Sequence, residues 1–185
     1  MRHALTKPTH ENGDFYRELK KSGKSHAQHV GVWIDYNDIP LDLIITSSAE
    51  RARKTAEKTC KAAGFPTSLI QEVDALYNSS AIELQTYLKQ LSSETNNVMI
   101  VAHNPGISMF AQGLIKRHID MMPGTLIQFV FDDDWSNLDN IKSFEHFVLE
   151  EPMLPTLFPY PQKNPVEKRL KPAYYYQQSS VIPYR

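Results

Sequence analysis

Short apolar runs alternate with amphipathic stretches over the first two thirds of the 185-residue chain. Leu43-Ile44-Ile45 and Val98 to Ala102 are continuous apolar runs of strand length, which is typical of strands buried on both faces. Ala49 to Ala63 is rich in good helix formers, and the apolar residues from Ile107 to Ile115 recur at helical spacing. Strands that alternate with helices of this length predict an α/β fold, a three-layer α/β/α domain with a mainly parallel sheet.

The N-terminal part combines a loop with a helix. The segment from Leu5 to Leu19, which contains Gly13 and Asp14, is spaced like a surface loop. Apolar residues then recur at helical spacing up to Tyr36, and Ser22 is the expected N-cap of this helix.

Four further segments have weaker signals. Gln71-Glu72-Val73 is a weak strand, and Ser80 to Glu83 has the spacing of a capping box that opens a helix. Thr125 to Phe131 and Phe144 to Leu149 are additional strand candidates, separated by an acidic turn.

The composition changes at Glu151. Seven of the 12 prolines and five of the nine tyrosines lie beyond this point. Proline at this density excludes a regular helix or a central strand. We therefore divide the chain into a domain, residues 1–150, and a Pro/Tyr-rich extension, residues 151–185. The extension is expected to pack on the domain or on a partner, where it would allow a homo-oligomer.

Composition narrows the class of protein. The chain is 41% hydrophobic, and its 20 basic residues nearly balance 21 acidic ones. A net charge close to zero argues against nucleic acid or an anionic membrane as the main partner. Cys60 is the single cysteine, so no intramolecular disulfide can form, and no apolar run approaches the length of a bilayer span. The expectation is a soluble, cytoplasmic protein.

Three polar clusters follow the predicted strands or the start of the chain: Arg2-His3, Ser47 with Arg51, and His103-Asn104. Ligands of open α/β sheets bind outside the carboxyl ends of the strands, so these clusters are expected to converge. Arginine offers a planar fork that matches phosphate oxygens, and a neutral imidazole can attack phosphorus. The pattern therefore predicts a phosphate site.

The same clusters lie in three ordered sequence blocks: Arg2-His3-Ala4, Ser47 to Ala56, and Val101 to Gly106. They resemble the Arg-His-Gly/Ala, Ser-Ser-Pro-x-x-Arg-Ala-x-Gln-Thr-Ala and Val-Gly-His-Asn-Pro-Gly blocks of the histidine phosphatase, or phosphoglycerate-mutase-like, superfamily. The resemblance covers roughly residues 1–149. The features similar to the small SixA-like branch are Arg17-Glu18-Leu19 with Gly23, Leu76-Tyr77 and Trp135.

The resemblance implies a phosphoryl-transfer site. His3 matches the nucleophile that takes the phosphoryl group transiently, and Arg2, Arg51 and His103 match residues that hold the phosphate oxygens. Ser47 and Asn104 belong to the same expected phosphate-binding set. Neither a metal nor another cofactor is expected. The family places the Arg-His pair at the end of a central strand, so that strand is expected to lie upstream of Met1 or to be lost, with impaired activity.

The proton donor of such a site is not fixed by the sequence. Asp74 and Glu72 are the candidate general acids, and each is equally well explained as a loop acid in water. An imidazole leaving group needs less protonation than an alkoxide, which favours phosphohistidine on a protein as the substrate. Two alternatives remain open: a phosphatase of small phosphate monoesters, and a non-catalytic module that binds phosphate or a phosphoprotein.

Overall fold

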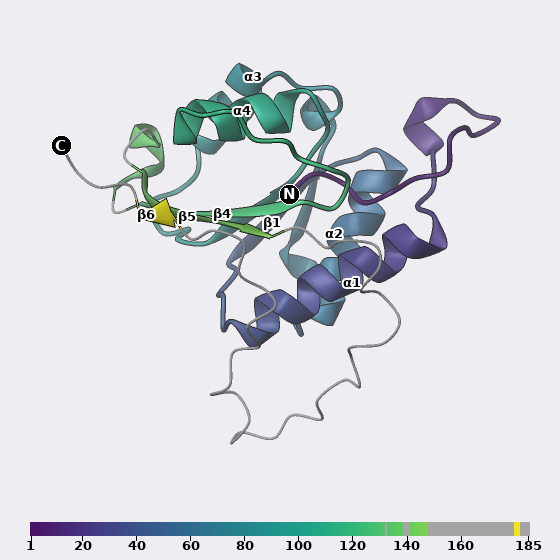
Figure 1. Cartoon of the computed structure of the whole chain (residues 1–185), viewed down its shortest axis with the longest axis horizontal. Coiled ribbons are helices and arrows are strands. Elements are labelled where there is room, and N and C mark those ends of the chain that lie inside the picture. Colours follow the sequence, from purple (N-terminus) through teal and green to yellow (C-terminus); the bar gives the residue numbers. More distant parts are fainter. Residues whose placement is uncertain (132, 139–140, 148–179, 182–185) are drawn as a thin grey trace.

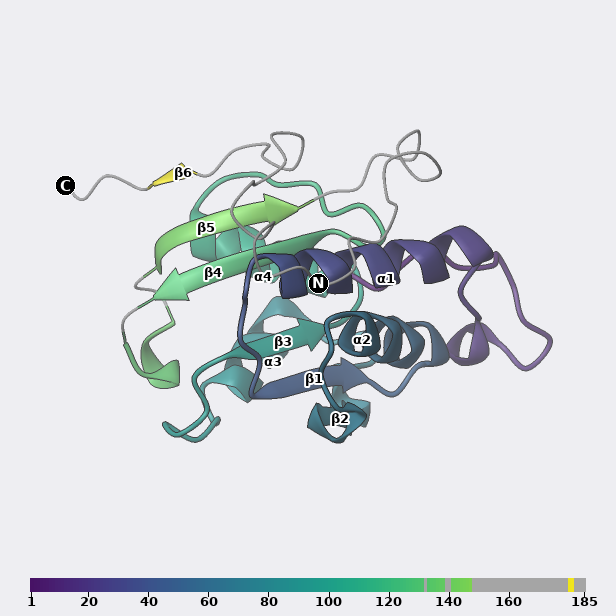
Figure 2. The same ribbon diagram turned by 90° about the horizontal axis from the view of Figure 1, so that it is seen from below.

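The computed structural model describes residues 1–131, 133–138, 141–147 and 180–181. Its strands form a central layer between two pairs of helices, as Figures 1 and 2 show. Helices α1 (Lys21–Tyr36) and α2 (Glu50–Ala62) cover one face, and α3 (Ala81–Leu88) and α4 (Gly106–Ile115) cover the other. The predicted three-layer α/β/α architecture is confirmed.

One half of the strand layer is a parallel sheet. β1 (Leu43–Ser47) lies between β2 (Ile70–Val73) and β3 (Val98–Val101), and both pairings are parallel. The helices α2 and α3 provide the crossovers between these strands, as a parallel order requires. The carboxyl ends of β1 and β3 therefore point to the same edge.

The other half of the strand layer is antiparallel. β4 (Leu126–Phe131) pairs with β5 (Ile141–Phe147), and β5 pairs with the two-residue strand β6 (Ser180–Val181). The remainder of the predicted C-terminal extension, together with residues 148–150, lies outside the described residues.

The first three residues run between the two halves. His3 donates its backbone N–H to the carbonyl oxygen of Ala102 at 3.1 Å, and Ala102 donates to the carbonyl oxygen of Met1 at 3.2 Å. On the other side, the backbone N–H of Arg2 donates to the carbonyl oxygen of Thr125 at 3.0 Å. Residues Met1 to His3 thus take the place of a short central strand beside β3.

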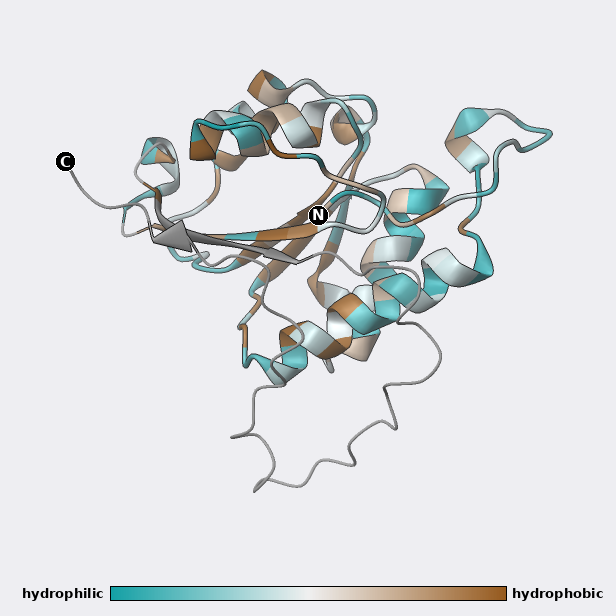
Figure 3. Ribbon diagram, in the orientation of Figure 1, coloured by the Kyte–Doolittle hydropathy of each residue, from teal (hydrophilic) through white to brown (hydrophobic). Residues whose placement is uncertain are grey.

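Alternation along the strands separates two apolar cores. Ile44 packs with residues of α1 and α2, whereas its neighbour Ile45 packs with residues of α3 and α4. Both side chains are fully buried. Figure 3 shows the same arrangement, with largely hydrophobic strands between helices of mixed hydropathy. Burial of both faces explains the continuous apolar runs in the sequence.

The predicted cap of α1 is wrong. Ser22 lies inside the helix, and Lys20 is the N-cap, with no side-chain cap bond. The start is fixed by a contact with Leu5, whose carbonyl oxygen accepts the backbone N–H of Lys20 at 2.9 Å. Gly23 packs so closely on Leu5 that an added Cβ would lie 2.1 Å from that oxygen. By contrast, the capping box formed by Ser80 and Glu83 is confirmed.

Short 3-10 helices connect several of these elements: η1 (Asp14–Tyr16), η2 (Thr67–Leu69), η3 (Asp74–Leu76) and η4 (Trp135–Asn137). η1 lies in the segment between His3 and α1, which projects from the body of the domain in Figure 1. Among the described residues, no helix combines the length and the apolar composition of a membrane span.

Candidate active site

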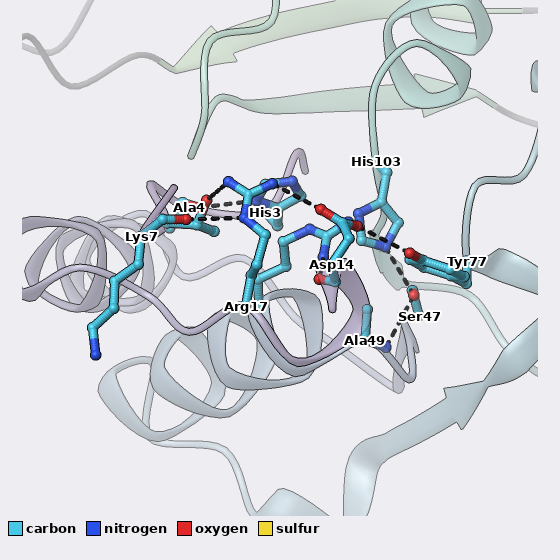
Figure 4. A network of polar contacts seen from close by, with 11 residues as sticks. His3, Ala4, Lys7, Asp14, Arg17, Ser47, Ala49, Tyr77 and His103 are labelled. Atoms are coloured by element: carbon cyan, nitrogen blue, oxygen red, sulfur yellow. Dashed lines mark hydrogen bonds and ion pairs between the residues drawn. The ribbon is translucent and has the colours of Figure 1, made fainter. Parts of the chain in front are cut away.

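Residues from three separate segments meet at one edge of the strand layer (Figure 4). His3 follows the Met1–Arg2 segment, Ser47 ends β1, and His103 follows β3. The ring centroids of His3 and His103 are 5.1 Å apart. Nε2 of His103 lies 2.8 Å from Oγ of Ser47. The structure thus brings together side chains that are more than 40 residues apart in the sequence.

A backbone contact defines the tautomer of His3. Its Nδ1 lies 2.9 Å from the carbonyl oxygen of Ala4. Because a carbonyl oxygen can only accept, Nδ1 must carry the hydrogen in this contact. In the neutral ring, Nε2 then keeps its lone pair, which is the condition for acting as a nucleophile.

The surroundings of His3 keep its ring neutral. Burial is the main cause that lowers its pKa, to about 3, against the opposing effect of the hydrogen bond to Ala4. The positive charges of Arg51 and Arg2, together with His103, lower the pKa further. The ring is therefore neutral near pH 7, with its single nitrogen-bound hydrogen on Nδ1.

His103 is buried beside His3 and is also neutral. Burial lowers its pKa to about 4, and the charge of Arg51 contributes in the same direction. Oγ of Ser47 contacts its Nε2 and also accepts the backbone N–H of Ala49 at 3.3 Å. Nδ1 of His103 is buried without a hydrogen-bond partner. The ring therefore has an unused polar atom inside the site.

Arg51 lies in the first turn of α2 with its side chain only 5% exposed. One terminal nitrogen donates to the carbonyl oxygen of Asp14 at 2.7 Å, and the other donates to Oδ2 of the same residue at 2.8 Å. The guanidinium carbon also lies 5.7 Å from the ring centroid of Tyr77. The positive charge of Arg51 lowers the pKa of both His3 and His103.

Asp14 is a site residue that the sequence did not reveal, since its segment was interpreted as a surface loop. Oδ1 accepts from Arg17 at 2.9 Å, and Oδ2 accepts from the hydroxyl of Tyr77 at 2.9 Å as well as from Arg51. The hydrogen bond from Arg17, followed by Tyr77 and Arg51, lowers the pKa of Asp14 to about 2 against the effect of burial. The available signal was Arg17-Glu18-Leu19, three residues further along.

Arg2 and Asn104 meet at a backbone oxygen beside the site. Arg2 donates to the carbonyl oxygen of Met121 at 2.7 Å, and Nδ2 of Asn104 donates to the same oxygen at 3.3 Å. Nε of Arg2 is buried without a hydrogen-bond partner. The positive charge of Arg2 lowers the pKa values of His3 and His103, so this residue acts on the site electrostatically.

The two acids expected from the sequence lie elsewhere. Glu72 is on β2 and Asp74 begins η3, and both residues are exposed. Within the described part of the chain, neither carboxylate forms a hydrogen bond or ion pair with His3, Arg51 or His103. Among the same residues, no cluster of three His, Cys, Asp or Glu side chains is arranged to hold a metal ion.

Comparisons with known proteins identify the fold and the superfamily that the chain resembles. Residues 1–78 match the family described as the histidine phosphatase superfamily, branch 1. A candidate phosphohistidine phosphatase SixA from Agrobacterium tumefaciens is 26% identical, with a TM-score of 0.57 over 62% of this chain and 73% of that chain. This chain has the histidine phosphatase fold. The resemblance to that superfamily and to its SixA-like branch is therefore confirmed.

Two further structures share the histidine phosphatase fold at lower identity. A candidate phosphohistidine phosphatase SixA from Nakamurella multipartitia is 23% identical, with a TM-score of 0.63 over 76% of this chain and 87% of that chain. The protein histidine phosphatase SixA complexed with tungstate is 19% identical, with a TM-score of 0.65 over 71% and 86% of the two chains. The sequence comparison with curated proteins gave no match.

Proposed function

We propose that this chain is a phosphatase in which Nε2 of His3 receives a phosphoryl group and then passes it to water. The observation that carries the proposal is the contact between Nδ1 of His3 and the carbonyl oxygen of Ala4. This contact leaves Nε2 unprotonated in a buried neutral ring, as a nucleophile requires. Membership of the fold supports phosphatase chemistry in general.

In this proposal Arg51 and Arg2 supply the positive charge that offsets the phosphoryl oxygens. Catalysis of phosphoryl transfer consists largely of positioning and of stabilising charge on the equatorial oxygens. His103 is placed to donate a hydrogen bond once a phosphate dianion raises its proton affinity. Ser47 positions the His103 ring, and Asn104 shares the carbonyl oxygen of Met121 with Arg2.

Two displacements complete the proposed reaction. In the first, Nε2 of His3 forms a bond to phosphorus, and the bond from phosphorus to the leaving group breaks with its electron pair on the leaving group. In the second, water attacks phosphorus, and the bond to Nε2 breaks so that His3 regains its lone pair. The water loses one proton, which goes to solvent, and inorganic phosphate is released.

We propose phosphohistidine on a protein as the substrate. Within the described residues, Asp14 is the only carboxylate that hydrogen-bonds to His3, Arg51 or His103, and its low pKa keeps it ionised. An ionised carboxylate cannot donate a proton to a departing alkoxide. An imidazole leaving group needs little such help, because its conjugate acid has a pKa of about 6.5.

Phosphate release tests this function. Wild type is expected to release phosphate from a phosphohistidine protein faster than from p-nitrophenyl phosphate, and His3→Ala is expected to release none from either. His118→Ala, which changes an exposed histidine, is the matched control and should behave as wild type.

A covalent intermediate provides a second readout. Brief incubation of wild type with labelled substrate should leave an acid-labile phosphoryl group on His3. Turnover that persists in His3→Ala contradicts the proposed nucleophile. Saturable phosphate binding without turnover would identify a non-catalytic binding module instead.

A further inference from the structure

The carboxylate of Asp14 lies on the solvent side of Arg51. The Arg51 side chain is 5% exposed and the Asp14 side chain 50% exposed, so the arginine is covered while the acid faces water. Both terminal nitrogens of Arg51 donate to Asp14, one to the backbone carbonyl and the other to the carboxylate. In this structure, Asp14 therefore lies between the Arg51 guanidinium and solvent.

Carboxylate and phosphate bind a guanidinium in the same way. Both are anions whose oxygens accept hydrogen bonds from the arginine fork. A phosphoryl group that approaches Arg51 from solvent meets a negative charge already bound there. The two anions repel one another, so phosphate gains the full use of Arg51 only when the carboxylate of Asp14 moves away.

We propose that Asp14 is an internal competitor of the phosphoryl group for Arg51 and thereby sets the affinity of the site for phosphate anions. This inference rests on the proposed phosphatase function and adds a residue to it. Its consequence is weak retention of the inorganic phosphate product, because the tethered carboxylate returns to Arg51 when phosphate departs.

The structure provides a second partner for the displaced carboxylate. Arg17 holds Oδ1 of Asp14 and is itself fixed by donating to the backbone oxygen of Lys7 at 2.9 Å and to the hydroxyl of Thr6. These contacts of Arg17 do not involve Arg51. Asp14 can therefore leave Arg51 and keep an ion pair with Arg17, so the displacement does not leave an unpaired charge.

Calorimetric titration with inorganic phosphate tests the competition. Asp14→Asn keeps the shape of the side chain and one acceptor oxygen but removes the charge, and we expect its dissociation constant for phosphate to be at least fivefold lower than that of wild type. Glu11→Gln makes the same charge change at an exposed position in the same segment and should leave the constant within twofold. Equal or weaker binding by Asp14→Asn would overturn the proposal and would make Asp14 an orienting partner of Arg51.

A second, milder variant tests the competition even if Asp14→Asn does not fold. Tyr77→Phe removes one donor to Asp14 and leaves its charge in place, so the carboxylate is freer to move. A smaller gain in phosphate affinity, about twofold, is expected, and a loss of affinity contradicts the competition. Phosphohistidine turnover is measured on the same samples. It tests the proposed phosphatase function separately, because turnover requires His3 whatever the affinity of the variant for inorganic phosphate.

Discussion

The backbone N–H of Ala4 donates a hydrogen bond to Oγ1 of Thr55 at 3.0 Å. The same hydroxyl donates to the carbonyl oxygen of Arg51 at 2.7 Å. Thr55 is fully buried. One hydroxyl group thus connects the residue after His3 to the first turn of α2, which carries Arg51.

Replacement of this hydroxyl should loosen the site. Thr55→Val preserves shape but leaves the N–H of Ala4 without its partner, and a buried unsatisfied donor costs about 1–3 kcal/mol of unfolding free energy. Phosphatase kcat should also fall by about tenfold, because catalytic geometry tolerates little looseness. Urea unfolding and phosphate release measure the two effects.

Thr55→Ser is the matched control, because it keeps the hydroxyl and loses only a methyl group. Its kcat should remain close to that of wild type. If the Val and Ser variants are equally active, the hydroxyl has no part in holding the site.

Two glycines of α4 should respond in opposite directions to alanine. A Cβ on Gly106 would lie 1.9 Å from the backbone oxygen of Ser79, so Gly106→Ala forces the start of α4 away and is expected to cost about 3 kcal/mol. Gly113 has open space around its Cβ position, and Gly113→Ala should stabilise by about 0.5–1 kcal/mol through helix propensity. Thermal unfolding of both variants checks the contrast, and a stable Gly106→Ala would contradict the close packing.

Stability should fall as the pH falls from about 6.5. Burial lowers the pKa of His3 to about 3 and those of His103 and His26 to about 4, while an unfolded histidine titrates near ~6.5. Between these values the unfolded chain binds more protons than the folded chain, so acid favours unfolding. The contribution of these three histidines to the free energy of unfolding is fully present above pH ~6.5 and is lost progressively as the pH falls toward their folded pKa values of about 3 to about 4.

Urea midpoints measured from pH 7.5 to pH 4.5 test this dependence. His26→Gln removes one of the three buried histidines and should reduce the fall in the urea midpoint between pH 7.5 and pH 4.5. His118→Gln changes an exposed histidine and should decline in parallel with wild type. A midpoint that rises toward pH 5 would contradict neutral buried rings.

The contact between Ser47 and His103 should affect activity. Ser47→Ala removes the partner of the His103 ring at the end of β1. We expect kcat/KM to fall by about tenfold, which corresponds to ~1.4 kcal/mol of lost positioning. The control is Ser48→Ala, because the hydroxyl of Ser48 is buried without a hydrogen-bond partner and its removal breaks no bond. Equal losses in the two variants would show that Ser47 has no particular role.

The fold could be predicted from the sequence because the patterns that indicate its strands and helices lie within short segments. Strands such as β1 and β3 are buried on both faces, so they appear as continuous apolar runs bounded by polar residues. Polar residues after these runs mark the carboxyl ends of the strands. Because the carboxyl ends of parallel strands lie at the same edge of the sheet, His3, Ser47 and His103 could be predicted to lie close together.

Asp14 was missed because nothing local distinguishes it from a solvated loop acid. Its partners Arg51 and Tyr77 lie 37 and 63 residues away, and only the tertiary structure brings them together. The cap of α1 was misplaced for a similar reason, since packing of Gly23 on Leu5 outweighs the cap preference of Ser22. Asp74 lies close to Tyr77 in the sequence but is directed to solvent.

The position of Met1 to His3 between β3 and Thr125 has a consequence for the order of folding. Met1 contacts Ile100 across a separation of 99 residues, whereas β1, β2 and β3 pair over shorter loops. Closing longer loops costs more chain entropy, so we expect these contacts to form late. In this folding order, the segment that carries His3 is expected to dock on a sheet that has already formed. During refolding, recovery of activity should lag behind recovery of the helical signal, which makes turnover a reporter of the last step.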